Sequence, residues 1–325
     1  MNTLLKPWLV CVMTVLAISS THSLHAQTTS RKIAITVDDL PGMSAMAMDA
    51  AQVTEMNKKL LASLQAEKAP AIGFVNEERL YKSGEADARI AVLNSWLDAG
   101  FDLGNHTFSH TSLNHVELKD WEDDVVQGES VTRILLNRHH KTLRYLRHPY
   151  LDAGPDLATR RQAEAFLAAR GYRVAPVTMD SFDWYFADLY GNSRQHGDIA
   201  AQQKIVQAWL AYTDDVFTHD EQKSRKLMGY EPKQVLLLHD TWLEADHITD
   251  LLALLRRRGY QFISLDDALT DPAYAQPDDY ISDVGASWID HWAVTQGHPE
   301  SPEEKPALPK WIQEKHRALD ADDSQ

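Results

Sequence analysis

Gly104-Asn105-His106-Thr107-Phe108-Ser109-His110 follows a short apolar segment that is typical of a buried strand end. Two histidines four residues apart, on one helical turn or in a tight loop, point to the same side of the chain. Two imidazoles on one side can bind a single metal ion if a third ligand comes from elsewhere in the fold. An isolated His-x-x-x-His pair is more commonly structural, so the interpretation depends on polar residues at the ends of other strands.

Short apolar runs alternate with longer amphipathic ones from Arg31 onward, which is the signature of β/α units. Gly100, Gly171 and Gly259 end three of the helices, because glycine accepts the left-handed backbone of a helix C-cap. The predicted strands are Lys32–Val37, Ala71–Val75, Phe101–Gly104, Leu143–Arg147, Arg173–Val177, Gln234–His239 and Gln261–Leu265. The predicted helices are Ala50–Glu67, Ala86–Ala99, Leu118–Asn137, Asp156–Ala169 and Ala245–Arg258. Seven strands with helical crossovers predict either a barrel or a doubly wound sheet. The periodicity of apolar residues does not distinguish these two folds.

Two segments interrupt this alternation. Phe182–Lys233 is a long interval that includes the helical patterns Ile199–Tyr212 and Asp215–Leu227, and we interpret it as an insertion that covers one face. Residues 271–325 are rich in proline and acidic residues and carry three tryptophans, which either dock this C-terminal extension onto the barrel or line a sugar groove. Docking is the more common role of such residues.

Residues 1–26 have the composition of a secretory signal peptide. Lys6 provides the basic region, an apolar stretch follows, and Leu24-His25-Ala26 is an acceptable cleavage site. The apolar run is shorter than the roughly 20 residues that cross a bilayer, so we expect no stable membrane anchor. Cys11, the single cysteine, lies inside the apolar stretch, which leaves the mature chain without a thiol. We therefore expect a periplasmic or secreted protein that has neither a disulfide nor a thiolate site.

The formal net charge is −15, and removing residues 1–26, whose one charged side chain is Lys6, makes it −16. An acidic protein of this kind is repelled by phosphate backbones, so nucleic acid is excluded as a partner. The sequence does not indicate an oligomeric state.

Polar residues follow several predicted strands at the end where parallel β/α folds place their active sites. Two adjacent carboxylates repel each other, so a cation beside the first pair is favourable. Beyond the His106/His110 pair, the residues concerned are Asp38-Asp39 after the first strand, Arg147-His148-Pro149-Tyr150 after the fourth, Asp180-Ser181-Phe182-Asp183-Trp184 after the fifth and His239-Asp240 after the sixth. Each of these groups, taken singly, has a structural explanation as good as a functional one.

Together, these five groups, in this order, resemble the polysaccharide deacetylase family, the carbohydrate esterases with a NodB homology domain. The resemblance covers residues 31–269. It implies a distorted (β/α)7 barrel with a long insertion before the sixth strand, and removal of an N- or O-acetyl group by metal-activated water. Together with the signal peptide and the change of composition at residue 271, it gives the expected domain division: the signal peptide 1–26, the catalytic domain 27–270 and the C-terminal extension 271–325, docked on the barrel.

The resemblance further implies the roles of individual residues. Asp39, His106 and His110 would bind the metal, with zinc the first choice and cobalt or nickel alternatives. Asp38 would be the general base, held by Arg147, and His239 the general acid, oriented by Asp183. The main-chain N–H of Tyr150 would stabilise the oxyanion, and Trp184 would line the pocket for the acetyl methyl group.

The chemistry of these residue types supports such a division of labour. One carboxylate and two imidazoles leave open positions on a metal for water and a carbonyl oxygen. A base must be ionised and an acid cationic, so we expect Arg147 to lower the pKa of Asp38 and a nearby carboxylate to raise the pKa of His239. The expected pH profile is therefore bell-shaped.

Two features depart from the family pattern. Leu40 stands where members commonly carry glycine after the paired aspartates, which bears on substrate shape. The long insertion argues against assuming an extended polymer groove, so a short oligosaccharide or a small acylated molecule is a plausible substrate. The substrate class is thus an acetylated carbohydrate such as a chitooligosaccharide or a peptidoglycan fragment.

Three rival functions remain open. The same fold could hydrolyse cyclic amides or imides without a metal, a reading that the complete set of ligand residues opposes. Two histidines and a carboxylate also describe an iron oxygenase, although those enzymes have a β jelly roll. A non-catalytic carbohydrate-binding protein would keep the barrel but lose the base or the acid, whereas Asp38 and His239 are both present.

Overall fold

The computed structural model describes residues 31–299 and 304–323. The predicted signal peptide, residues 1–26, lies outside the described residues. Among the helices described, none combines the length and apolar character that crossing a bilayer requires.

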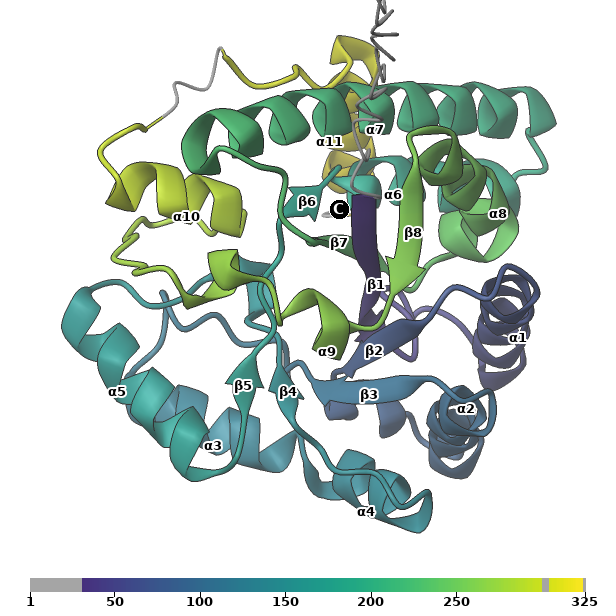
Figure 1. Ribbon diagram of the computed structural model, residues 1–325. Coiled ribbons are helices and arrows are strands. Elements are labelled where there is room, and N and C mark those ends of the chain that lie inside the picture. Colours follow the sequence, from purple (N-terminus) through teal and green to yellow (C-terminus); the bar gives the residue numbers. More distant parts are fainter. Residues whose placement is uncertain (1–30, 300–303, 324–325) are drawn as a thin grey trace, which may run out of the picture.

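A parallel sheet is curled into a half-barrel and surrounded by helices, so the predicted barrel is confirmed (Figure 1). Its central strand β1 (Arg31–Leu40) is buried from Ile33 to Leu40 because neighbours cover both of its faces. β1 pairs along its length with β7 (Gln234–His239) on one side. On the other side it pairs with β8 (Tyr260–Ile263) near its start and with β2 (Ala71–Val75) near its end.

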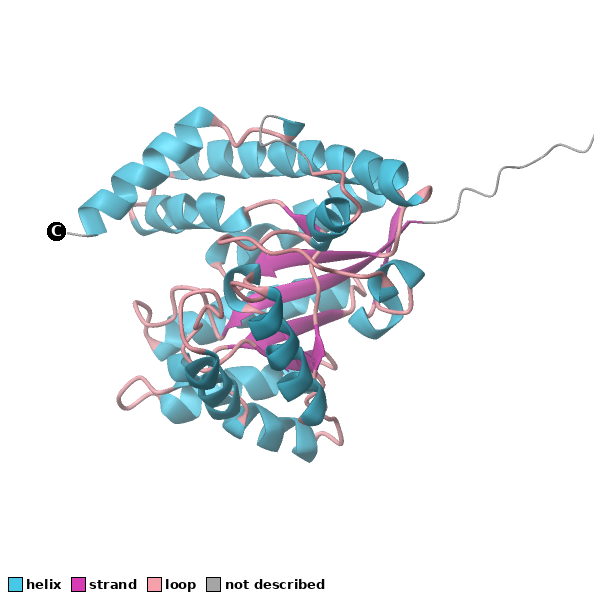
Figure 2. Ribbon diagram, turned by 90° about the vertical axis from the view of Figure 1, so that its left-hand side faces the viewer, coloured by secondary structure: helices cyan, strands magenta, loops and turns pink. Residues whose placement is uncertain are grey.

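The half-barrel continues outward from β2. β3 (Asp102–Asn105), β4 (Tyr145–Leu146) and β5 (Arg173–Val174) follow on that side, and β6 (Met179–Asp180) completes the other side next to β7. In Figure 2 the strands run side by side with helices above and below them. All strands point the same way, so their carboxyl ends share one edge, as the sequence predicts.

The predicted fifth strand, Arg173–Val177, is wrong in one respect, because two short strands occupy this region. The N–H of Ala175 donates to the carbonyl of Leu146 beside β4, whereas that of Thr178 donates to the carbonyl of Val235 in β7. Between them stands Pro176, which has no N–H to continue a ladder. The chain therefore crosses from one edge of the curled sheet to the other within four residues.

The helices follow the predicted pattern with two changes. Leu118–Asn137 is not one helix, because it breaks at Gly128, and the insertion has one long helix where two patterns were predicted. The α-helices are α1 (Ala50–Ala66), α2 (Ala86–Asp98), α3 (Leu118–Gln127), α4 (Ser130–Arg138), α5 (Leu157–Ala169), α6 (Asp183–Gln195), α7 (Ile199–Met228), α8 (Trp242–Arg257), α9 (Leu265–Ala268), α10 (Trp288–Thr295) and α11 (Lys310–Asp323). Short 3₁₀ helices are η1 (Glu77–Leu80), η2 (Pro149–Leu151) and η3 (Pro272–Ala275).

The C-terminal extension packs against the half-barrel where its two edges meet. The N–H of Trp288 donates to the carbonyl of Val177 at 2.6 Å, in the crossing between β5 and β6. Trp288 is 8% exposed and Trp292 is 1% exposed, in a cluster with Leu151 and Leu237. Figure 1 shows α10 beside this region, with α7 above it and α5 below. These two tryptophans are therefore packing residues.

Candidate metal centre and active site

Asp38 and Asp39 end β1, and a left-handed residue brings both carboxylates to one side. Asp39 has φ 71°, a conformation that costs a non-glycine residue about 1–2 kcal/mol. Arg79, from η1, donates through Nη1 to the carbonyls of Asp39 and Gly42, both at 3.1 Å. Its Nη2 lies 3.3 Å from Asp39 Oδ1. Arg79 thus holds both the turn and the carboxylate in place.

His106 follows β3 and its ring is oriented by a neighbouring strand end. Its Nδ1 lies 2.8 Å from the carbonyl of Arg147, so Nδ1 carries the proton and Nε2 is free to accept a metal. His110, four residues on, has φ 61°, which turns its ring back toward His106. The two ring centroids are 4.8 Å apart.

The loop that carries both histidines rests on the end of α3. A Cβ added to Gly128 would lie 2.6 Å from the carbonyl carbon of Thr107 and 2.7 Å from the nitrogen of Phe108, so glycine allows this close approach. Asp124 accepts hydrogen bonds from the N–H of Ser109 at 3.1 Å and from its hydroxyl at 2.8 Å. Asp124 is 8% exposed and supports the loop that carries both histidines.

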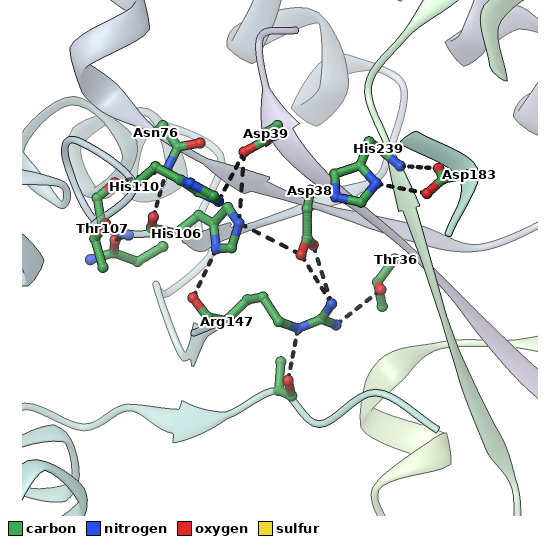
Figure 3. Close-up of polar contacts among 12 residues, drawn as sticks. Thr36, Asp38, Asp39, Asn76, His106, Thr107, His110, Arg147, Asp183 and His239 are labelled. Carbon is green, nitrogen blue, oxygen red and sulfur yellow. Dashed lines mark hydrogen bonds and ion pairs between the residues drawn. The ribbon is translucent and has the colours of Figure 1, made fainter. Parts of the chain in front are cut away.

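Asp39, His106 and His110 form a three-residue group whose potential ligand atoms all lie within 4.8 Å of one another (Figure 3). Asp39 Oδ1 is 3.7 Å from His106 Nε2 and 3.6 Å from His110 Nε2. Those separations exceed a hydrogen bond, yet bonds of about 2.0–2.2 Å at tetrahedral angles place ligand atoms about 3.3–3.6 Å apart. The three residues therefore fit a divalent metal ion such as zinc.

The protonation states suit such an ion. Burial lowers the pKa of both His106 and His110, so the rings are neutral near pH 7. Burial alone would raise the pKa of Asp39, but Arg79 and the two histidines hold it well below its usual range. Two neutral imidazoles and one carboxylate are the protonation states that metal ligands need.

Asp38 lies beside this group and is paired with a buried arginine. Nη1 of Arg147 is 3.2 Å from Asp38 Oδ2, and Asp38 Oδ2 is 3.6 Å from His106 Nε2. Nη2 of Arg147 donates to Thr36 Oγ1 and Nε donates to the carbonyl of Ala175, so the guanidinium is held by β1 and by the segment between β5 and β6. The expectation that the pKa of Asp38 is lowered is wrong: burial outweighs Arg147 and raises it to about 6.

His239 faces Asp38 from the end of β7. Its Nδ1 is 2.8 Å from Asp183 Oδ1, and its main-chain N–H donates to Asp183 Oδ2 at 2.7 Å. Burial would lower the pKa of His239, but Asp183, assisted by Asp39 and Asp38, raises it to about 10. The imidazolium is therefore the stable form near neutral pH, as expected.

Tyr150 contacts this group, whereas the ring contacts of Trp184 are with Tyr185 and the C-terminal extension. Tyr150 has φ 57°, and its ring lies edge-on to His110 with the centroids 4.4 Å apart. Trp184 stacks on Tyr185 at 3.8 Å and meets the ring of His316, in α11, at 5.2 Å. Helix α11 of the C-terminal extension thus reaches the residue that was predicted to line the acetyl pocket.

Three residues around the site were given no role from the sequence. Arg79 contacts Asp39 from a segment with no motif, and Asp240 and Glu244 lie buried behind the strand ends. Burial raises the pKa of Asp240 to about 7 and raises that of Glu244, which lies near Asp183. The nearest signal was the position of Asp240 directly after His239.

Comparisons with known proteins concern the family and the fold of this chain. Residues 25–170 match the family model described as polysaccharide deacetylase. The search of curated proteins gave no match.

Solved structures include a CE4 family pseudoenzyme from Bacillus anthracis, with 12% identity, a TM-score of 0.50, and coverage of 74% of this chain and 66% of that one. A polysaccharide deacetylase from Bacillus cereus has 18% identity, a TM-score of 0.49 and coverage of 72% and 91%. A family 4 carbohydrate esterase from Streptomyces lividans in complex with acetate has 20% identity, a TM-score of 0.45 and coverage of 73% and 95%. The similarity to the Bacillus anthracis protein shows the fold. The match over residues 25–170 confirms the resemblance seen in the sequence: this part of the chain carries a polysaccharide deacetylase domain, which belongs to a class of hydrolases.

Proposed function

We propose that this chain is an exported, metal-dependent deacetylase that removes N- or O-acetyl groups from a carbohydrate. One observation carries the proposal: the potential ligand atoms of Asp39, His106 and His110 converge within 4.8 Å beside the buried Asp38–Arg147 pair, and the His239–Asp183 pair lies at the end of the neighbouring strand. Figure 3 shows the acidic and basic side chains pointing toward the same space.

Asp39, His106 and His110 would hold the metal, most suitably zinc, with cobalt or nickel as alternatives. When bound, the ion makes a water molecule more acidic and polarises the acetyl carbonyl. Carboxylate Asp38 accepts the proton of the attacking water. Arg147 keeps this carboxylate oriented, because its own guanidinium is fixed by Thr36 and Ala175.

His239 supplies the second proton transfer. Its imidazolium donates a proton to the leaving amine or alkoxide as the bond to the acetyl carbon breaks. Asp183 keeps Nδ1 protonated and Nε2 directed into the site. The Tyr150 N–H would stabilise negative charge on the acetyl oxygen.

The rival functions predict different results. A metal-free hydrolase of cyclic amides or imides would keep its rate in a chelator. The second rival is a non-catalytic carbohydrate-binding protein. One solved structure with the same fold is described as a pseudoenzyme, and a fold alone does not establish activity. Against it stands the presence of the base Asp38 and the acid His239, each with its buried partner.

The experiment is acetate release from chitooligosaccharides, peptidoglycan fragments and acetylated xylan, compared for the native chain and the Asp38→Asn variant. The proposal predicts release from at least one substrate and its loss in the variant. Binding of these carbohydrates without acetate release would support the non-catalytic alternative. Cleavage of cyclic amides or imides, without acetate release from any of the three glycans, would support the metal-free hydrolase.

A further inference from the structure

Tyr150 and Leu151 form a turn that L-amino acids rarely adopt. Their φ values are 57° and 59°, so two consecutive non-glycine residues lie in the left-handed region. The backbone is disfavoured there, because Cβ approaches the following carbonyl oxygen. Such a turn persists only where surrounding structure fixes it. The structure shows contacts that do so, and they come from the C-terminal extension.

Gly285 packs directly against the outer side of this turn. A Cβ at position 285 would lie 2.0 Å from the carbonyl oxygen of Tyr150 and 2.6 Å from the carbonyl carbon of Leu151. The φ of Gly285 is outside the left-handed range. Glycine is required here because the two backbones lie so close together. The main-chain N–H of Gly285 also hydrogen-bonds the buried carboxylate of Asp152.

Asn114 links the same segment to the metal-binding loop. This residue stands four positions after His110, and its Oδ1 accepts the N–H of Gly154 at 2.9 Å. Its Nδ2 donates to the carbonyl of Ser282 at 3.1 Å. The loop after His110, the loop after Tyr150 and the extension therefore meet at one junction, which we name the tail junction and define as Asn114, Asp152, Gly154, Ser282 and Gly285.

The C-terminal extension is attached to the rest of the fold both before and after the tail junction. Asp278 accepts hydrogen bonds from Arg160 Nη2 at 2.5 Å and from His291 Nδ1 at 2.9 Å. After the junction, Trp288 is buried and donates its N–H to Val177. A segment fixed at both ends can transmit this rigidity to the turn it contacts.

We propose that Ser282–Gly285 is a positioning element of the active site, which holds the Tyr150–Leu151 turn and thereby the Tyr150 N–H in the geometry that catalysis needs. This rests on the proposed function only for its catalytic consequence. A displacement of the order of 1 Å at such a donor costs about a hundredfold in rate. The extension would thus be a part of the site, although the family motifs end well before it.

Two variants of the full chain test this inference. Gly285→Ala introduces the clash with the turn, and Asn114→Ala removes the hydrogen bonds to Gly154 and Ser282 without adding an atom. Gly191→Ala, in α6, is the matched control, since a Cβ there meets no atom within 4 Å. Circular dichroism and thermal melting establish which variants fold.

The first measurement is amide hydrogen exchange of the metal-free chains over residues 148–153. At least one folded junction variant should exchange about tenfold faster or more there, while Gly191→Ala matches the parent. Unchanged exchange in every folded junction variant would overturn the inference, and if Gly285→Ala does not fold, Asn114→Ala decides.

The second measurement separates positioning from a general structural defect. With a substrate that the parent hydrolyses, kcat should fall by about ten- to a hundredfold, whereas KM and the metal Kd stay within about twofold. A loss of metal affinity that accounts for the lost rate would overturn the positioning role. If the parent hydrolyses no acetylated carbohydrate, the proposed function fails, and hydrogen exchange still decides whether the junction holds the turn.

Discussion

Replacing Asp183 with asparagine tests how the acid His239 is kept protonated. The Asp183 carboxylate is fully buried and accepts hydrogen bonds from both the ring and the main chain of His239, at 2.8 Å and 2.7 Å. Burial by itself lowers the pKa of the imidazole, and Asp183 is the strongest of the groups that raise it to about 10. Asparagine keeps the shape but removes the charge.

The expected loss of activity follows from the pKa of His239 with and without the Asp183 carboxylate. An acid must be protonated to act, so its contribution is full below its pKa and is lost as the pH rises through it. Without the carboxylate, the pKa of His239 should fall to the ordinary value of about 6.5 or below. At pH 8 about 3% of the imidazole would then be protonated, which predicts about a 30-fold loss of kcat. At pH 6 the loss should be small.

The assay is the pH dependence of kcat between pH 5 and pH 10.5 for the parent and Asp183→Asn. The parent should lose activity only as the pH approaches about 10, whereas the variant should begin to lose it below pH 7. Asp250→Asn is the control, because Asp250 accepts from His247 Nδ1 at 2.9 Å on the exposed face of α8. A basic limb that stays near pH 10 in Asp183→Asn, with full activity at pH 8, would refute the reasoning.

Three further predictions concern the base, the acid and the loop. Arg147→Met removes a positive charge that lowers the pKa of Asp38. In the parent, the acid limb of kcat/KM should lie at or below pH 6, because a bound cation also favours the carboxylate, and in the variant it should move to higher pH. An acid limb that does not move would mean that a group other than Asp38 titrates there. His239→Ala should lose about 10²–10⁴-fold in turnover while isothermal titration shows unchanged metal affinity, and near-parental turnover would refute its role as acid. Gly128→Ala should lower the free energy of unfolding in urea by about 1–3 kcal/mol, since its Cβ would press on Phe108; an unchanged midpoint would contradict the close packing.

The sequence predicted the elements and motifs whose signal is local. The alternation of apolar and amphipathic runs identified most of the helices and strands. The family resemblance carried by the polar residues at strand ends named Asp39, His106 and His110 as a group, and the structure brings these three residues together. Parallel strands explain this success, because residues at their carboxyl ends converge wherever those strands lie in the chain.

What the sequence did not predict depends on contacts between distant segments. Strand β6 has two residues and exists because its partner β7 is nearby, which no period reveals. The break at Gly128 reflects the approach of a loop 20 residues earlier, and Arg79 contacts Asp39 across 40 positions. The raised pKa of Asp38 follows from its burial, whereas its charged neighbours alone predicted the opposite.

The central claim is that a metal held by Asp39, His106 and His110 is required for acetyl hydrolysis. Its most direct test is the rate of acetate release from the best acetylated carbohydrate after chelation and dialysis, followed by titration with zinc, cobalt or nickel. The account predicts that activity is lost and then returns in full at one equivalent of metal, and that His106→Ala recovers none at the same concentration. Acetate release that continues undiminished in the metal-free chain would contradict it.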